Sequence, residues 1–125
     1  MKSSFAKIVA VLGASPKPQR YSNKAIKMLK NHGYCVIPIH PTLDKIEGLK
    51  VIADLKSITE KVDTLTLYIG PQRSAGLIDS IIGLKPNRVI FNPGTESEEL
   101  ELKLMENHIP YVKDCTLIML EHDRF

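Results

Sequence analysis

The chain has 125 residues, of which 43% are hydrophobic and 25% are charged; this length is enough for one globular domain and too short for two. Lysine and arginine outnumber aspartate and glutamate by 17 to 14, so the formal net charge is +3, a small excess that favours a small anionic ligand over nucleic acid. There is no tryptophan and no apolar run of signal-peptide or membrane-spanning length, so we expect a cytoplasmic protein with no membrane partner.

Short apolar segments alternate along the chain with segments of helical periodicity. In chain order, we predict a strand over 7–12, a helix over 22–32, a strand over 35–39, a strand over 64–69, a helix over 74–83, a strand over 88–91, a helix over 97–107 and a strand over 111–113. Residues 42–61 are expected to be irregular, with a short extended piece near 50–52, and the apolar segment 116–120 is not assigned.

Strands that are apolar nearly throughout are typical of a parallel sheet with helices on both faces. We therefore predict one α/β domain over residues 1–125, a Rossmann-like, doubly wound sheet of five parallel strands in three layers. The expected strand order is 3-2-1-4-5. Ligands of such sheets bind beyond the carboxyl ends of the strands, at the switch point beside strand 1.

The segment that follows the first strand has the composition of an anion-binding loop. Gly13 can adopt a positive φ and leave room for a phosphate, and Arg20 can supply a charge-assisted hydrogen bond. The candidate residues of this loop are Gly13, Ala14, Ser15, Lys17, Arg20, Tyr21 and Ser22. The alternative is an ordinary strand–helix connection in which Ser22 caps the helix, and the loop alone does not distinguish the two.

The loop differs from the usual dinucleotide-binding motif G-x-G-x-x-G. Gly13 is present, but Ser15 and Pro18 occupy the positions of the other two glycines. The second strand ends at His40 and the first acid beyond it is Asp44, whereas an NAD-binding sheet carries an acidic residue there for the ribose. These departures disfavour nicotinamide cofactors and leave a different diphosphate-containing nucleotide.

Three further strand ends are predicted at the same edge of the sheet. Their candidate binding residues are His40, Pro41, Lys45, Ile69, Gly70, Pro71, Arg73 and Gly94. Each segment has a structural alternative, which is a strand-terminating proline, a turn, or a helix start capped by Thr95 and Glu98. For His40 and Pro41 alone the structural alternative is favoured, and for the segment around Gly94 the helix cap is expected whether or not a ligand also binds there.

We predict no catalytic residues and no metal site. The two cysteines and four histidines do not have metal-ligand spacing, and neither a catalytic triad order nor a Walker A motif is present. His40 is the only histidine beside a strand end, but the sequence places no carboxylate to orient it. Cys35 is expected in the core, and Cys115, which follows Asp114, is expected to be structural.

Taken together, these motifs are similar to a known family. They are V-L-G-A-S-P-K-P-Q-R-Y-S at 11–22, N-H-G-Y at 31–34, V-I-P-I-H-P at 36–41, G-L-K-V at 48–51 and D-C at 114–115. From about Lys7 to about Glu121 the chain resembles the stand-alone CoA-binding proteins, whose fold is like the N-terminal CoA-binding domain of the succinyl-CoA synthetase α subunit.

The resemblance implies that CoA or acyl-CoA is the cofactor. It implies that the diphosphate is bound by Gly13, Ala14, Ser15, Arg20 and Ser22. The adenosine 3′-phosphate would then face His40, Pro41 and Lys45. The adenine or ribose would be flanked by Ile69, Gly70, Pro71 and Arg73, and the pantetheine chain would pass near Gly94. The chain departs from the family where His40 replaces a frequent Asn and Thr42 a frequent basic residue. The ligase chemistry of the synthetase belongs to a further domain and is not implied.

Three functional hypotheses follow. The leading one is a small CoA-binding protein that is not catalytic by itself. The second is an NAD(P)- or acyl-CoA-dependent enzyme that uses His40 or Cys115. The third is a regulatory or redox interaction domain that carries bound CoA, for which Cys35 and Cys115 are the thiols available. The sequence leaves open both a protein partner and a homo-oligomer.

Overall fold

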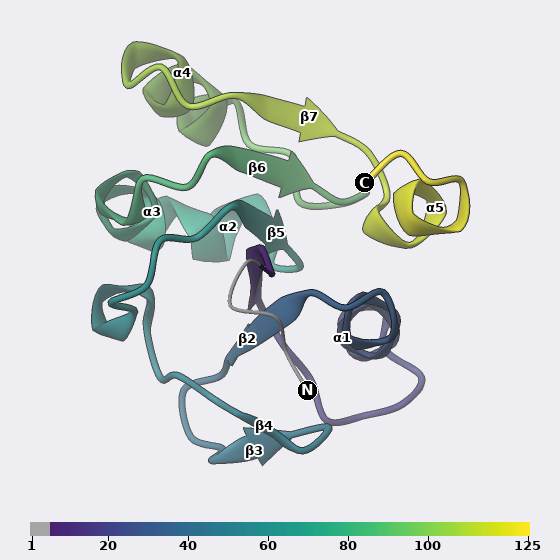
Figure 1. The fold of residues 1–125 in the computed structure, drawn as a ribbon. Coiled ribbons are helices and arrows are strands. Elements are labelled where there is room, and N and C mark those ends of the chain that lie inside the picture. The colour runs from purple at the N-terminus through teal and green to yellow at the C-terminus, as the bar shows by residue number, and fades with distance from the viewer. Residues whose placement is uncertain (1–5) are drawn as a thin grey trace.

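The computed structural model describes residues 6–125, and Figure 1 shows the course of the chain. In chain order the elements are β1 (Ile8–Leu12), α1 (Tyr21–Asn31), β2 (Cys35–Ile39), β3 (Lys45–Ile46), β4 (Leu49–Lys50), the 3₁₀ helix η1 (Leu55–Ser57), β5 (Thr64–Leu67), α2 (Pro71–Ser74), the 3₁₀ helix η2 (Ala75–Leu77), α3 (Ile78–Leu84), β6 (Arg88–Phe91), α4 (Glu98–Glu106), β7 (Tyr111–Lys113) and α5 (Thr116–Glu121).

Five of the strands form one parallel sheet in the order β2-β1-β5-β6-β7, and β3 and β4 form a separate antiparallel hairpin. The predicted Rossmann-like α/β class is therefore confirmed. The direction of winding reverses between β1 and β5, because the chain passes from β1 outward to β2 and later from β5 outward to β6 and β7. This pair of strands is the switch point of the sheet.

The predicted strand order 3-2-1-4-5 is wrong in one respect. It placed the segment 64–69 beside β2, whereas β5 pairs with β1. The position beside β2 is already filled by Ile52, which forms a parallel bridge with Ile39. The Ile52 N–H donates to Pro38 O over 3.0 Å, and the His40 N–H donates to Ile52 O over 3.2 Å. The extended piece near 50–52 thus occupies the edge that the prediction assigned to the later strand.

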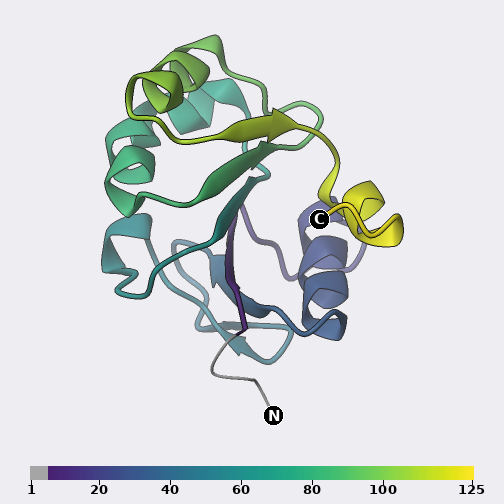
Figure 2. The same cartoon turned by 45° about the horizontal axis from the view of Figure 1, so that its top comes forward.

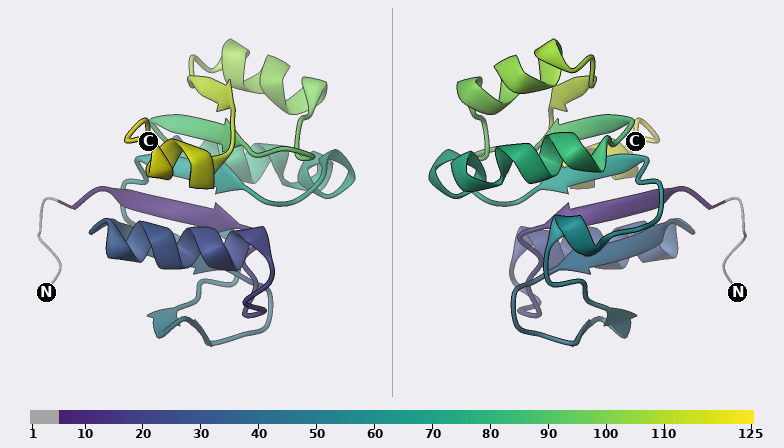
Figure 3. Two further views of the ribbon diagram at one scale, coloured as in Figure 1. Left: turned by 90° about the vertical axis from the view of Figure 1, so that its right-hand side faces the viewer. Right: turned by 90° about the vertical axis from the view of Figure 1, so that its left-hand side faces the viewer.

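Helices cover both faces of the sheet in a three-layer arrangement. Helices α1 and α5 lie side by side on one face (Figure 2), and α3 and α4 lie on the other (Figure 3). Strand β1 alternates between the two cores, since Val9 and Val11 pack toward α1 and α5, while Ala10 and Leu12 pack toward α3 and α4. Across residues 6–125, none of the helices is long and apolar enough to cross a bilayer.

Two helix starts differ from the prediction. The helix expected over 74–83 begins earlier, at Pro71, which occupies the first position of α2 behind the N-cap Gly70; proline is well suited to that position because it lacks an N–H. Helix α4 is capped by Ser97, whose hydroxyl accepts from the Leu100 N–H over 3.2 Å. Thr95, the expected cap, instead donates its hydroxyl to Asn92 O over 2.8 Å.

A buried hydrogen-bond network fixes the carboxyl end of β6 to its neighbours. Asn92 donates through Nδ2 to Thr66 Oγ1 over 2.6 Å and to Leu67 O over 2.8 Å. Its Oδ1 accepts from the N–H of Thr116 over 2.8 Å, and the hydroxyls of Thr66 and Thr116 are 2.8 Å apart. One amide side chain therefore connects β5, β6 and the first residue of α5.

We predict that Asn92→Ala lowers the free energy of unfolding by about 2–4 kcal/mol, because it leaves several buried groups without partners. Urea unfolding followed by circular dichroism measures this. Asn107→Ala is the control, since the exposed Asn107 amide makes one hydrogen bond to Lys103 O at the end of α4, and its loss should cost less than about 1 kcal/mol. Equal losses in the two variants would contradict a special role for the network.

Candidate functional site

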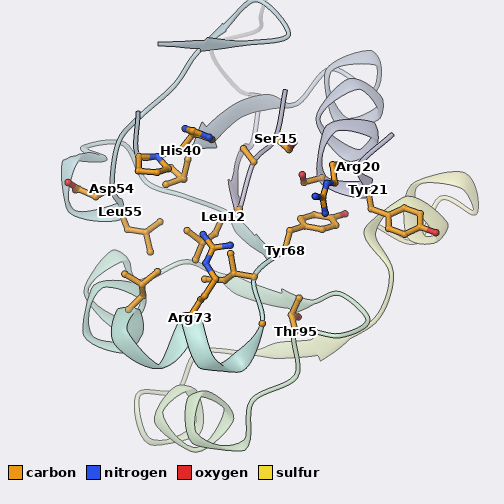
Figure 4. Close-up of a pocket in the computed structure, with 18 of the residues that line it drawn as sticks. Leu12, Ser15, Arg20, Tyr21, His40, Asp54, Leu55, Tyr68, Arg73 and Thr95 are labelled. Carbon is orange, nitrogen blue, oxygen red and sulfur yellow. The ribbon is translucent and has the colours of Figure 1, made fainter. Parts of the chain in front are cut away.

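A cavity of about 920 Å³ opens at the carboxyl ends of the central strands (Figure 4). Its walls come from the β1–α1 loop, the end of β2, the segment that contains η1, the end of β5 with the helices that follow it, and the β6–α4 loop. It therefore lies at the switch point between β1 and β5, where doubly wound sheets bind their ligands.

Most of the predicted binding residues lie in the wall of this cavity. They are Gly13, Ala14, Ser15, Lys17, Arg20, Tyr21, Ser22, His40, Pro41, Ile69, Gly70, Arg73 and Gly94. The structure does not bring Lys45 or Pro71 into the wall. Lys45 lies exposed in the β3–β4 hairpin, opposite Lys50, and Pro71 serves as the first residue of α2.

Sequence reasoning missed one whole wall of the cavity. The residues of the η1 segment that line it are Ala53, Asp54, Leu55 and Lys56. They reach the site because Ile52 pairs with β2, which carries the chain past the end of that strand. Further lining residues that were not predicted are Leu12, Ile39, Tyr68, Gly76, Leu77, Ser80, Pro93 and Thr95. No local motif marks the η1 segment, since its position follows from a long-range pairing.

Gly13 is required by the backbone and by its surroundings. Its φ is +92°, and a Cβ atom would lie 2.8 Å from Ile69 Cγ2 and 3.0 Å from the carbonyl of Tyr68. The predicted positive φ is therefore present. The space that a side chain would fill is occupied by Tyr68 and Ile69, which directly follow β5. Gly13 therefore also allows the segments that follow β1 and β5 to pack closely against each other.

The β1–α1 loop is held by hydrogen bonds within itself and to the end of β2. The Ala14 N–H donates to Ile39 O over 3.2 Å, the Lys17 N–H to Ser15 Oγ over 3.1 Å, and the Arg20 N–H to Lys17 O over 3.1 Å. These three amides are thus engaged within the protein. The amides of the first turn of α1, in contrast, have no acceptor within the helix.

Helix α1 begins at Tyr21, and its N-cap residue Arg20 makes no side-chain capping bond. Ser22 is therefore not the cap; it is the second helical residue and is buried. Tyr21 and Ser22 both line the cavity. The positive end of this eleven-residue helix consequently opens onto the cavity, an arrangement that favours an anionic group.

Positive charge dominates the lining. Lys17 and Arg20 come from the β1–α1 loop, Lys56 from η1 and Arg73 from α2, and Figure 4 shows the Arg20 and Arg73 side chains on different sides of the cavity. Asp54 is the one acid among the described lining residues. Its Oδ1 accepts from both the N–H and the hydroxyl of Ser57 at 3.0 Å, so it caps η1.

His40 stabilises the turn that follows β2. Its Nδ1 accepts from the N–H of Thr42 over 3.1 Å and from the N–H of Leu43 over 3.2 Å. In many turns an Asn side chain accepts hydrogen bonds from the backbone N–H groups that follow it. At this position the Nδ1 atom of His40 is the acceptor. In the neutral ring the proton is then on Nε2, which leaves Nε2–H as its donor.

Tyr68 connects the cavity wall to the core beneath it. Its side chain lines the cavity. Its hydroxyl is buried and has no hydrogen-bond partner among the described residues. Burial raises the pKa of Tyr68 to about 12, and the nearby hydroxyls of Thr116 and Thr66 oppose the shift. The phenol is therefore neutral throughout the physiological pH range.

Comparisons with known proteins show the family and the fold of the chain. A model of the CoA binding domain family matches residues 7–121. The chain belongs to this family. It is 30% identical over 112 residues to the uncharacterized protein YneT of Bacillus subtilis, and the matched segment covers 90% of this chain and 83% of YneT. The resemblance found in the sequence motifs is thereby confirmed.

Solved structures show the same architecture. The crystal structure of an uncharacterized protein has a TM-score of 0.89 and 46% sequence identity, and the match covers 96% of this chain and 98% of that chain. A dinucleotide-forming acetyl-coenzyme A synthetase of Ca. Korarchaeum cryptofilum, in complex with phosphate and ADP, has a TM-score of 0.75. At 23% identity the match covers 86% of this chain and 25% of the synthetase, so it shows the shared fold alone.

The Tyr68 pKa gives a pH-dependent prediction for stability. The folded-state pKa of Tyr68, about 12, is above the ordinary tyrosine value of about 10, so folding favours the protonated phenol. The contribution of this phenol to the free energy of unfolding is therefore complete below pH 10 and is lost as the pH rises toward 12. Tyr68→Phe should lack this part of the alkaline loss, which is on the order of 2 kcal/mol. At pH 7 the free energy of unfolding of this variant should be unchanged or slightly higher, because within residues 6–125 the buried hydroxyl of Tyr68 has no hydrogen-bond partner.

Chemical unfolding at several pH values between 7 and 11.5 tests this prediction. Tyr21→Phe is the control, because Tyr21 is 69% exposed and its variant should lose stability with pH as the wild type does. A wild-type-like pH profile for Tyr68→Phe would contradict the prediction.

Proposed function

We propose that the protein is a small cytoplasmic CoA-binding protein, which holds CoA or acyl-CoA in the switch-point cavity and is not catalytic by itself. The observation that carries the proposal is the placement of thirteen of the predicted ligand-binding residues around one cavity of about 920 Å³. Membership of the CoA binding domain family supports the same ligand.

In this proposal the diphosphate lies at the start of α1. The first-turn amides of the helix supply neutral donors, and Arg20 and Lys17 supply positive charge from the adjoining loop. Ser15 and Ser22 add hydroxyl groups. This assignment needs no rearrangement of the loop, because its internal hydrogen bonds leave the helix start open to the cavity.

The adenosine end of CoA would lie beyond β2. There Pro41 and Ile69 provide apolar surface, and Arg73 provides charge from α2. Lys45 does not reach this region, so we assign the 3′-phosphate contact to Lys56, which lines the cavity from η1. Gly94, whose φ is +91°, lies in the β6–α4 loop on the side proposed for pantetheine.

Two features favour binding over catalysis. The Nδ1 atom of His40 is engaged by two backbone N–H groups of its own turn, and neither Cys35 nor Cys115 is among the residues that line the cavity. The enzyme hypothesis keeps a clear test, because turnover of an acyl-CoA or a nicotinamide nucleotide that His40→Ala abolishes would overturn the non-catalytic proposal.

We predict that CoA binds with a dissociation constant in about the micromolar range. Isothermal titration calorimetry with CoA, acetyl-CoA and NAD measures this directly, and intact-mass spectrometry of gently purified protein identifies any ligand that is carried through purification. The proposal fails if CoA and acetyl-CoA bind no better than about millimolar while NAD binds well.

Arg20→Ala should weaken CoA binding by about 1–3 kcal/mol, or about 5- to 150-fold, which is the scale of a charge-assisted hydrogen bond. Lys45→Ala is the matched control, because it removes the same charge from an exposed residue outside the cavity wall. Its CoA affinity should remain within about twofold of the wild type. Equal effects in the two variants would remove Arg20 from the site.

A further inference from the structure

A contact outside the cavity joins the anion-binding loop to the β3–β4 hairpin. Asn23, in the first turn of α1, is completely buried. Its Nδ2 donates to Ser15 O over 2.9 Å and to Glu47 Oε2 over 3.1 Å. One side-chain amide thus connects a residue of the cavity wall, the start of α1 and the turn of the hairpin. The left view of Figure 3 shows this hairpin below α1.

The hairpin end of this contact is itself fixed. Glu47 and Gly48 form the turn between β3 and β4, with φ values of 51° and 75°, as a two-residue hairpin turn requires. The ammonium group of Lys30, near the end of α1, donates to Glu47 O over 2.6 Å. Glu47 is therefore held between both ends of α1, with Asn23 at the first turn and Lys30 at the last.

The contact has two local costs. The Oδ1 atom of Asn23 is buried and has no hydrogen-bond partner among the described residues, which opposes stability. Glu47 adopts a left-handed backbone conformation, which is unfavourable for a residue with a Cβ atom. The hairpin turn accounts for the conformation of Glu47, whereas nothing in the turn requires the buried, unpaired Oδ1 of Asn23. A buried polar group that is kept at such a cost beside a cavity wall is typical of groups that serve a binding site.

We propose that Asn23 and Glu47 are positioning residues for the anion site. They hold the Ser15 carbonyl and the first turn of α1 in the arrangement that receives the diphosphate, so that binding does not have to order the loop. The inference rests on the proposed CoA-binding function for its ligand. The geometry of the contact is present without the ligand, and it therefore has a test of its own.

The first measurement is amide hydrogen exchange of the ligand-free protein. Glu47→Ala should accelerate exchange in residues 14–24 several-fold without changing exchange in the central strands, because it releases the loop and leaves the core intact. Glu47→Gln keeps an acceptor oxygen for Asn23 and should restore the wild-type rates. Lys50→Ala, at an exposed position of the same hairpin, is the control for a general effect on the hairpin.

The second measurement is CoA affinity by calorimetry. Glu47→Ala and Asn23→Ala should each weaken binding about 3- to 10-fold, and the double variant should be no weaker than Asn23→Ala, because both changes remove the same contact. Glu47→Gln and Lys50→Ala should bind as the wild type does. If Asn23→Ala does not fold, the Glu47 series still decides the question.

The two proposals fail in different ways. Absence of CoA binding by the wild type overturns the proposed function, and the exchange measurement then still decides whether Asn23 and Glu47 hold the loop. Wild-type exchange rates in residues 14–24 of Glu47→Ala overturn the positioning role. Altered exchange together with unchanged CoA affinity limits the contact to a structural role and also overturns the inference.

Discussion

The parallel bridge between Ile39 and Ile52 determines where the cavity forms. It fills the edge of the sheet beside β2, while β5 pairs with the other edge of β1, where the winding reverses. The same bridge carries the chain past the end of β2, which brings η1 into the cavity wall. This short pairing therefore supplies the wall that contains Lys56 at the switch point.

A second constraint is the contact between Gly13 and the end of β5. Because Ile69 and Tyr68 occupy the space of a Cβ atom at Gly13, the loops that follow β1 and β5 leave the sheet close together. Tyr68 then continues this contact into the core on the α1 and α5 side. The buried hydrogen bonds of Asn92, Thr66 and Thr116 lie at the same edge of the sheet. They therefore stabilise the part of the fold on which the site is built.

How far the sequence predicts this structure depends on the range of the interactions involved. The β1–α1 loop was found because its signal is local: an apolar run, Gly13 and then polar residues before a helix. The position of β5 follows from its pairing with β1, and the η1 wall follows from the pairing of Ile52 with Ile39. Neither long-range pairing is revealed by sequence periodicity. The resemblance places a basic residue just after Pro41, and Lys45 is the first one there, but Lys45 lies exposed in the β3–β4 hairpin, opposite Lys50 and outside the cavity wall.

The distribution of charge and hydrogen bonds explains how a small domain can present a formed anion site. Amides of Ala14, Lys17 and Arg20 are engaged within the protein, so the loop keeps its shape while the helix start provides the donors. Cationic side chains then approach from the loop, from η1 and from α2. These segments converge through the sheet topology, so the shape of the cavity depends on long-range packing. In the proposed role of Asn23, a buried residue just behind the cavity wall would alter ligand affinity while the lining side chains stay the same.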